Sequence, residues 1–161
     1  MQANKKGKIF FSIVFVCYVV VIFMVVVLKV NHEALSITRD CIKMNRASGF
    51  WNYNIIPFKT IRTYMNLGSS VGIENLVGNI IPFLPVGFLL RFIFDKSCMK
   101  KTFWVSLFIV IIFESIQFFA CIGFFDIDDI ILNVLSSVLG CVICAPITKR
   151  VKIIMNNFEI Q

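Results

Sequence analysis

The sequence predicts an all-α polytopic membrane protein, a bundle of four transmembrane helices. Hydrophobic residues make up 58% of the chain and charged residues only 16%, whereas soluble domains carry about 25% charged residues. The mean hydropathy is +0.87. Four segments approach the roughly 20 apolar residues that cross a bilayer, and clusters of Lys and Arg flank them.

The first span is predicted at residues 9–28, which contain no charged residue. A secretory signal peptide has a shorter apolar core, followed by a cleavage site of small residues. The sequence KVNHEAL after this span supplies no convincing site of that kind. We therefore expect a retained anchor, bracketed by Lys5, Lys6, Lys8 and Lys29.

Three further spans are predicted at about 76–94, 102–122 and 129–147, which together form a membrane core over residues 76–147. Each is interrupted by polar or helix-bending residues. These are Asn79, Pro82 and Pro85 in the second span, Glu114 and Gln117 in the third, and Asn133, Ser136 and Ser137 in the fourth.

The orientation follows from the basic residues, which are retained on the cytoplasmic side of a membrane. With four spans, three clusters fall on one side: Lys5, Lys6 and Lys8; Lys96, Lys100 and Lys101; and Lys149, Arg150 and Lys152. We therefore expect cytoplasmic termini, at residues 1–8 and 148–161. One long external loop, residues 29–75, then follows the first helix, and the acidic loop before the fourth span is also external. The isoelectric point of about 9.3 is explained by these flanking charges, and we expect no nucleic-acid partner.

The long external loop carries basic residues at helical spacing. Arg39, Lys43 and Arg46 recur at i, i+4 and i+7 and share one helix face. This predicts either an interfacial helix resting on anionic lipid headgroups or a solvated loop helix with ordinary surface charges. Arg62, in the same loop, is a candidate ion-pair partner for acidic residues.

Polar residues within the spans gather toward the expected outer ends. Helical spacing aligns Asn75 with Asn79, Glu114 with Gln117 and Asp129 with Asn133. We expect these pairs to line a polar funnel that opens outward. An ionisable group inside a membrane costs at least about 2.5 kcal/mol on insertion scales, so Glu114 is either a functional group or a hydrogen-bonded carboxyl that joins helices.

The stretch FFDIDD places three carboxylates directly before the fourth span. Asp128 is the predicted helix cap, and Asp129 is predicted to face the bundle interior because it shares a stripe with Asn133. If the three acids served only as caps, replacing all but one would cost little stability and leave function intact. Because Asn caps as well as Asp, Asp128→Asn is expected to be the mildest exchange. Mutual repulsion among Asp126, Asp128 and Asp129 requires relief by protonation, a basic side chain such as Arg39 or Arg62, or an external divalent cation.

The cysteines and the histidine carry weaker signals. Cys141 and Cys144 form a C-x-x-C motif inside the fourth span, where apolar packing is the expected role. Cys41 and Cys121 are both expected outside and could pair. His32 is the single histidine, which removes His-based triads and most zinc sites.

Several segments taken together resemble the VanZ-like family of small bacterial membrane proteins. They are N54-IIPFKTI, N75-LVG-N79-IIP-F83-L-P85-V-G87, E114-SI-Q117 and F125-D126-I127-D128-D129 followed by N133. The domain resemblance covers about residues 54–147. The chain departs from the family pattern at Gly123, where an Arg is usual, and at Ser136, where a Gly is usual.

The resemblance implies a multi-pass protein of the bacterial cell membrane, in a family whose founding member gives low-level teicoplanin resistance. We expect the polar funnel to engage an envelope lipid, a lipid precursor or an amphiphilic glycopeptide. The alternatives are an intramembrane enzyme acting on a lipid-linked substrate, with Glu114 as acid or base and the aspartates holding a divalent cation, and a structural partner of other membrane proteins. No cofactor other than such a cation is expected.

Overall fold

The computed structural model describes residues 2–28, 32–67, 70–94 and 98–148. Four of its helices are long and apolar enough to cross a membrane, over residues 5–27, 72–93, 98–119 and 127–148. The predicted four-helix membrane bundle is confirmed. Lys29 and several of the basic residues used to predict orientation (Lys96, Lys149, Arg150 and Lys152) lie outside the described residues, as does nearly all of the predicted tail.

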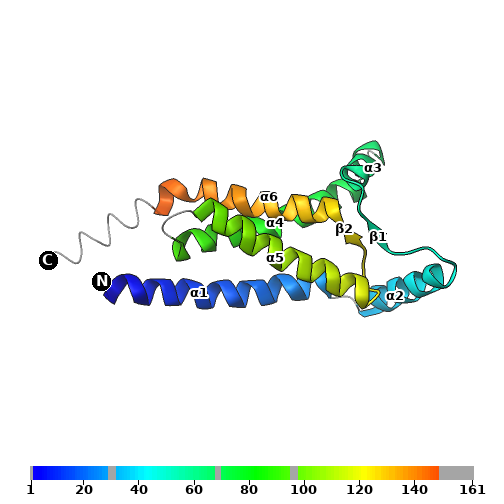
Figure 1. The fold of residues 1–161 in the computed structure, drawn as a ribbon, viewed down its shortest axis with the longest axis horizontal. Coiled ribbons are helices and arrows are strands. Elements are labelled where there is room, and N and C mark those ends of the chain that lie inside the picture. Colours follow the sequence, from blue (N-terminus) through cyan, green and yellow to red (C-terminus); the bar gives the residue numbers. More distant parts are fainter. Residues whose placement is uncertain (1, 29–31, 68–69, 95–97, 149–161) are drawn as a thin grey trace.

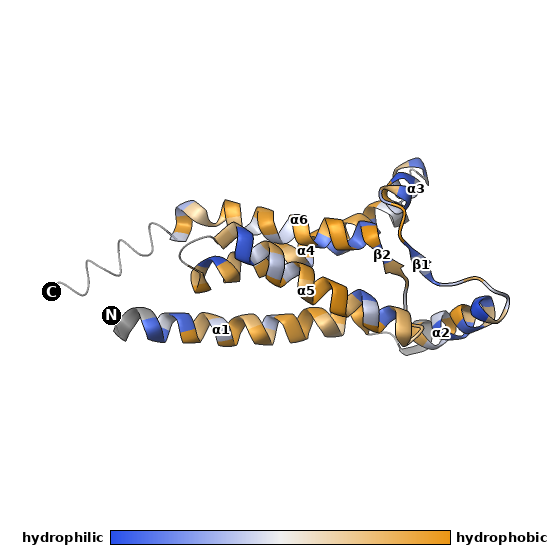
Figure 2. Ribbon diagram, viewed as in Figure 1, coloured by the Kyte–Doolittle hydropathy of each residue, from blue (hydrophilic) through white to orange (hydrophobic). Residues whose placement is uncertain are grey.

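The chain crosses the bundle four times. Helix α1 (Gln2–Ile22) continues into a π-helical turn, η1 (Phe23–Val27), and α4 (Ser70–Ile93), α5 (Cys98–Phe119) and α6 (Ile127–Ile143) form the other spans. Figure 1 shows that α1 begins at the same end of the bundle at which α6 ends. Figure 2 shows that hydrophobic residues dominate α1, α5 and α6, as lipid-exposed helices require.

The predicted external loop is folded. It contains α2 (His32–Ala47), α3 (Lys59–Leu67) and the short strand β1 (Tyr53–Asn54), all at the end of the bundle opposite the start of α1 (Figure 1). Strand β1 pairs in parallel with β2 (Phe125–Asp126), which directly precedes α6. Tyr53 is the register partner of Phe125, and Asn54 is the partner of Asp126.

Helices α4 and α6 approach each other closely because two glycines face the opposite backbone. A Cβ atom at Gly87 would lie 1.6 Å from the Ser137 carbonyl oxygen, and one at Gly140 would lie 2.0 Å from the Leu84 carbonyl oxygen. Small residues let membrane helices pack backbone against backbone, since the hydrophobic effect does not drive their association within lipid. The core around this contact is apolar and contains Phe83, Val86, Leu90, Val110, Phe113, Ile130 and Val134.

The ends of the helices differ from the predicted boundaries, and two of these differences affect the polar stripes. Helix α4 begins at Ser70, before the predicted start at residue 76, so Asn75 lies inside the helix. Helix α5 ends at Phe119, and Cys121 follows it with a φ of 56°. A positive φ breaks the helical path, so the helical stripe of Glu114 and Gln117 ends before Cys121.

Candidate ligand cavity

A cavity of about 790 Å³ lies at the end of the bundle where α2, α3 and the two strands meet the spans. Six of the seven polar residues predicted to form a site line it: Asn75, Asn79, Glu114, Gln117, Asp126 and Asp129. Its other lining residues include Trp51, Tyr53, Asn54, Lys59, Thr60 and Tyr64 from the segment between α2 and α4. The cavity is therefore formed jointly by the spans and by this outer segment.

Asn133 is the predicted site residue that the cavity wall does not include. It lies one helical turn along α6 from Asp129 and is only 2% exposed. Its Oδ1 atom has no hydrogen-bond partner within the described part of the chain. A buried acceptor without a donor costs free energy, and nothing in the arrangement explains this one.

The polar residues of α5 are buried and bonded to other elements. Glu114 is 3% exposed, and its Oε2 atom accepts the backbone N–H of Asp126 at 3.1 Å. Gln117 donates from Nε2 to the carbonyl oxygen of Val26 at 3.1 Å. Val26 belongs to the π-helical turn η1, a helix irregularity that is frequent at functional sites. Both side chains join elements and face the cavity at the same time.

Helix α4 contributes amides and an interrupted backbone. Pro82 lacks the N–H that an unbroken helix would donate to the carbonyl of Gly78, and both residues line the cavity. Asn79 donates from Nδ2 to Oδ1 of Asp129 at 2.5 Å, which joins α4 to the start of α6. The i, i+4 pair of Asn75 and Asn79 therefore lies on the cavity side, as the stripe predicted.

Asp126, and not Asp128, is the N-cap of α6, so the predicted assignment was wrong. The Asp126 side chain accepts the backbone N–H of Asp128 at 2.9 Å. It also accepts Oγ1 of Thr60 at 2.5 Å and Nδ2 of Asn54 at 3.1 Å. Asp126 has extended backbone angles and begins the helix one residue before Ile127, which is the geometry that an N-cap requires.

Asp128 has a different role, as an acceptor for the start of another helix. Its side chain is fully buried. Oδ1 accepts the backbone N–H of Phe58 at 2.5 Å, and Oδ2 accepts those of Thr60 at 2.8 Å and Ile61 at 3.2 Å. These amides lie at the N-terminus of α3, whose first N–H groups have no partner within the helix. Asp128 therefore caps α3 from a distant part of the chain.

The acidic triplet thus separates into three positions. Asp126 caps α6, Asp128 caps α3, and Asp129 faces the cavity beside Asn79. Amide and hydroxyl donors bond to Asp126 and Asp128, which offsets the repulsion expected from adjacent carboxylates. Within the described ranges, no group of three or more His, Cys, Asp or Glu residues is placed to hold a metal ion.

Tyr64 supplies a neutral hydroxyl to the cavity wall. Burial raises the pKa of its phenol above the usual value near 10, and the carboxylates of Asp129 and Asp126 raise it further. The side chain therefore keeps its proton at physiological pH. With Lys59 as the cation among the lining residues, the wall is rich in carboxylate and amide oxygens and suits a ligand that donates hydrogen bonds.

Several cavity residues of the outer segment were not predicted. Asn54, Lys59, Thr60 and Tyr64 lie in a stretch whose folded position depends on bonds to residues about 70 positions later in the chain. The motif N54-IIPFKTI contains Asn54, Lys59 and Thr60, but it indicated only a family resemblance, and Tyr64 lies beyond it.

The basic residues of α2 occupy one predicted helix, but they are not equivalent. Arg46 donates from Nε to Oδ1 of Asn52 at 2.7 Å and from Nη2 to the carbonyl oxygen of Phe118 at 2.6 Å. Its guanidinium lies 4.5 Å from the centroid of the Phe118 ring. Arg46 therefore ties α2 to α5. In contrast, Arg39 and Lys43 on α2 and Arg62 on α3 are exposed.

The cysteines are free, so the disulfide considered between Cys41 and Cys121 is absent. Cys41 is exposed and Cys121 is buried. Cys141 and Cys144 are both fully buried in the bundle, which fits the packing role expected from the C-x-x-C motif.

The fold and the cavity define a class: multi-pass membrane proteins with a polar cavity at one end of a four-helix bundle. Within this class the chain belongs to the VanZ/LLP1 family, which it matches over residues 15–150. It is 27% identical over 139 residues to Protein VanZ of Enterococcus faecium, an alignment that covers 83% of this chain and 73% of that protein. No solved structure matches the chain.

Proposed function

We propose that this protein is a bacterial cell-envelope membrane protein whose cavity opens outward and holds the polar head of an envelope lipid or a lipid-like amphiphile. The observation that carries the proposal is the cavity itself. Its volume of about 790 Å³ lies within the range of roughly 300–1,000 Å³ typical of small-molecule sites. Its location at the expected outer end of the bundle makes it accessible to molecules of the outer leaflet.

The lining chemistry supports a head group that donates hydrogen bonds. Glu114, Asp126 and Asp129 contribute carboxylate oxygens to the wall, and ionised carboxylates accept hydrogen bonds without donating any. Trp51 and Tyr64 add aromatic surface to the same wall. A hydroxyl-rich or amino-bearing head group fits these acceptors better than a bare anion, which the carboxylates would repel.

The family resemblance implies the glycopeptide teicoplanin as one candidate ligand. The direct test is susceptibility to teicoplanin and to vancomycin in cells with the gene deleted and then overexpressed. We expect overexpression to raise teicoplanin resistance selectively. An unchanged susceptibility to both drugs would count against a role in glycopeptide resistance.

Two variants test whether the cavity is responsible for the resistance phenotype. Asp129→Asn removes a charge from the wall, and we expect it to abolish the phenotype at normal membrane abundance. Asp40→Asn, on the exposed surface of α2, is the matched control and should leave the phenotype intact.

Glu114→Gln separates function from helix joining. The amide oxygen of Gln can still accept the N–H of Asp126, which the carboxylate accepts at 3.1 Å. Retained abundance with a lost phenotype would therefore assign a functional role to the Glu114 carboxyl group. Loss of folded protein would instead identify Glu114 as a residue that joins helices.

A further inference from the structure

The small two-stranded sheet separates two spaces of opposite polarity. Along a strand, successive side chains point to opposite faces. In β2, Asp126 lines the polar cavity, while its neighbour Phe125 lines a second, apolar groove. Asn54 of the other strand lines the cavity, and Ile55, which directly follows that strand, lines the groove. The sheet therefore has one polar face and one apolar face.

The register of the two strands strengthens this separation. Asn54 pairs with Asp126, and the Asn54 amide donates to the Asp126 carboxylate at 3.1 Å on the cavity side. Tyr53 pairs with Phe125, and both line the groove. Tyr53 also lines the cavity, so the two spaces meet at this side chain.

The apolar groove has a volume of about 310 Å³. Helix α5 forms its other wall, and the full set of lining residues is Tyr53, Ile55, Ser115, Phe118, Phe119 and Phe125. Ser115 donates its hydroxyl to the carbonyl oxygen of Ile111 at 2.6 Å, so its one polar group is satisfied within the helix. The groove therefore offers an almost entirely apolar surface.

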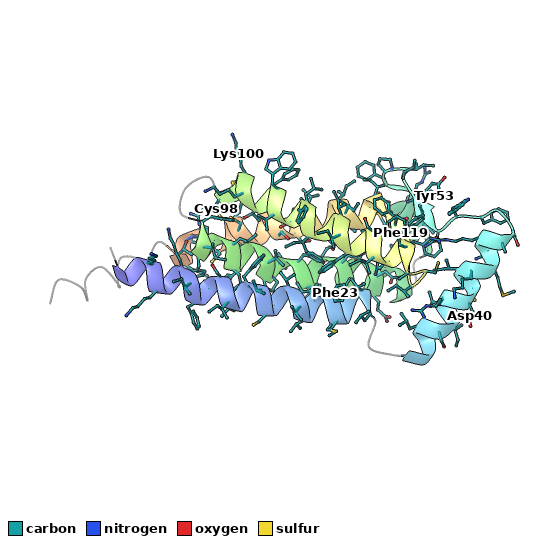
Figure 3. The ribbon with its side chains drawn as sticks, turned by 60° about the horizontal axis from the view of Figure 1, so that its bottom comes forward. Phe23, Asp40, Tyr53, Cys98, Lys100 and Phe119 are labelled. Atoms are coloured by element: carbon teal, nitrogen blue, oxygen red, sulfur yellow. The ribbon has the colours of Figure 1, made fainter. Side chains whose placement is uncertain are left out.

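The groove lies beside exposed apolar side chains. Phe119 is 77% exposed and Ile55 is 64% exposed, and Figure 3 shows Tyr53 and Phe119 at the same end of the molecule, opposite Cys98 and Lys100. The groove is continuous with α5, whose exposed apolar side chains include Phe108 and Trp104. In a membrane span, exposed apolar side chains of this kind contact lipid acyl chains.

We propose that this groove holds one acyl chain of the envelope lipid whose polar head occupies the cavity. The inference rests on the proposed function for the identity of the cavity as the head-group site. The polar and apolar faces of the sheet then correspond to the two parts of an amphiphile, and Tyr53 lies where head and chain join. Within lipid the hydrophobic effect does not drive a chain into the groove, so the groove favours lipid-linked molecules over free head groups through dispersion contacts with the chain.

The test uses the full-length protein in a steroid-based detergent, which supplies no acyl chains. The probe is a glycosyl diacylglycerol with a photoreactive group in one acyl chain, and adducts are mapped by mass spectrometry. We expect labelling of residues 115–125 to saturate at a probe concentration at least tenfold below that needed to label Leu135 and Leu139, which are exposed on α6.

Two tryptophan substitutions give the matched comparison. Ser115→Trp fills the groove and should lower its labelling at least tenfold. Ile81→Trp introduces the same side chain at an exposed position of α4 that lines neither space, and it should leave groove labelling within twofold of wild type.

The outcomes separate this inference from the proposed function. If labelling of the groove saturates no earlier than labelling of the α6 surface, the groove does not bind an acyl chain. This result would overturn the inference whatever the drug susceptibility shows. Saturable labelling that Ser115→Trp removes and Asp129→Asn also weakens supports both proposals. Saturable labelling that Ser115→Trp removes but Asp129→Asn leaves unchanged supports the groove and counts against the cavity as the site of the head group.

Discussion

Asp128→Asn should release the start of α3 from the bundle. The Asp128 carboxylate accepts three backbone N–H groups through its two oxygens. An Asn side chain keeps one acceptor oxygen and replaces the other with an NH₂ group that cannot accept. In the better orientation, the Asn oxygen keeps the two N–H groups that Oδ2 accepts. The third N–H group then loses its hydrogen bond to a charged acceptor and faces the NH₂ donor of Asn.

The expected change in the free energy of local opening follows from the loss of this one hydrogen bond. A hydrogen bond to a charged group contributes about 1.5–3 kcal/mol, so we expect local opening of residues 58–67 to become easier by roughly 2–3 kcal/mol. At about 1.4 kcal/mol for each factor of ten, amides in this segment should exchange with solvent deuterium roughly 30- to 150-fold faster. This reverses the sequence-based expectation that Asp128→Asn is the mildest of the three exchanges.

The assay is hydrogen–deuterium exchange on purified protein, read by mass spectrometry on peptides that contain residues 58–67. Asp40→Asn, an exposed exchange on α2, should change exchange in this segment by less than threefold because its carboxylate is solvated. If Asp128→Asn also stays within threefold of wild type, the three amide bonds do not hold this segment in place.

The remaining predictions concern packing, topology and ionisation. Gly87→Ala should lower the thermal midpoint sharply because its Cβ would meet backbone at 1.6 Å, whereas Gly78→Ala, with nothing within 4 Å, should not; equal midpoints would refute the close contact of α4 and α6. In a background without native cysteines, Asn66→Cys should react with an impermeant thiol reagent in intact cells and Lys100→Cys should not; the reverse pattern would invert the topology. The phenolate absorbance that Tyr64→Phe removes should emerge above pH 10, because burial and nearby carboxylates raise the pKa of Tyr64; emergence at or below pH 10 would contradict this environment. Since the protonated phenol is the form favoured by folding, any contribution to stability should be present below pH 10 and lost as the pH rises further.

The membrane architecture was largely predictable because its physical causes are local. An uncharged run such as residues 9–28 must pair its own backbone groups to cross lipid, which dictates a helix. The stripes were also local, since i, i+4 spacing alone placed Asn75 beside Asn79 on one face of α4. The boundaries were less predictable, because the end of α5 at Phe119 depends on the left-handed turn at Cys121.

The outer wall of the cavity could not be predicted because long-range bonds create it. Nothing near Asp128 in the sequence indicates that its carboxylate meets the amides of residues 58–61. The prediction that Asp128 accepts unpaired N–H groups at a helix start was correct, but the helix is α3 and not α6. Asn133 shows the opposite failure, since its spacing from Asp129 fits the stripe, yet the cavity wall stops one turn above it.

The bonds of the outer segment also fix the order in which the molecule can be assembled. Asn52 and Asn54 find partners in Gly123 and Asp126, about 70 residues later in the chain. During synthesis, that segment must wait without these partners until α5 has been inserted and the start of α6 has emerged. Maturation of the cavity is therefore a late event in biogenesis, and a nascent chain truncated before residue 126 should leave residues 52–61 open to proteases and chaperones.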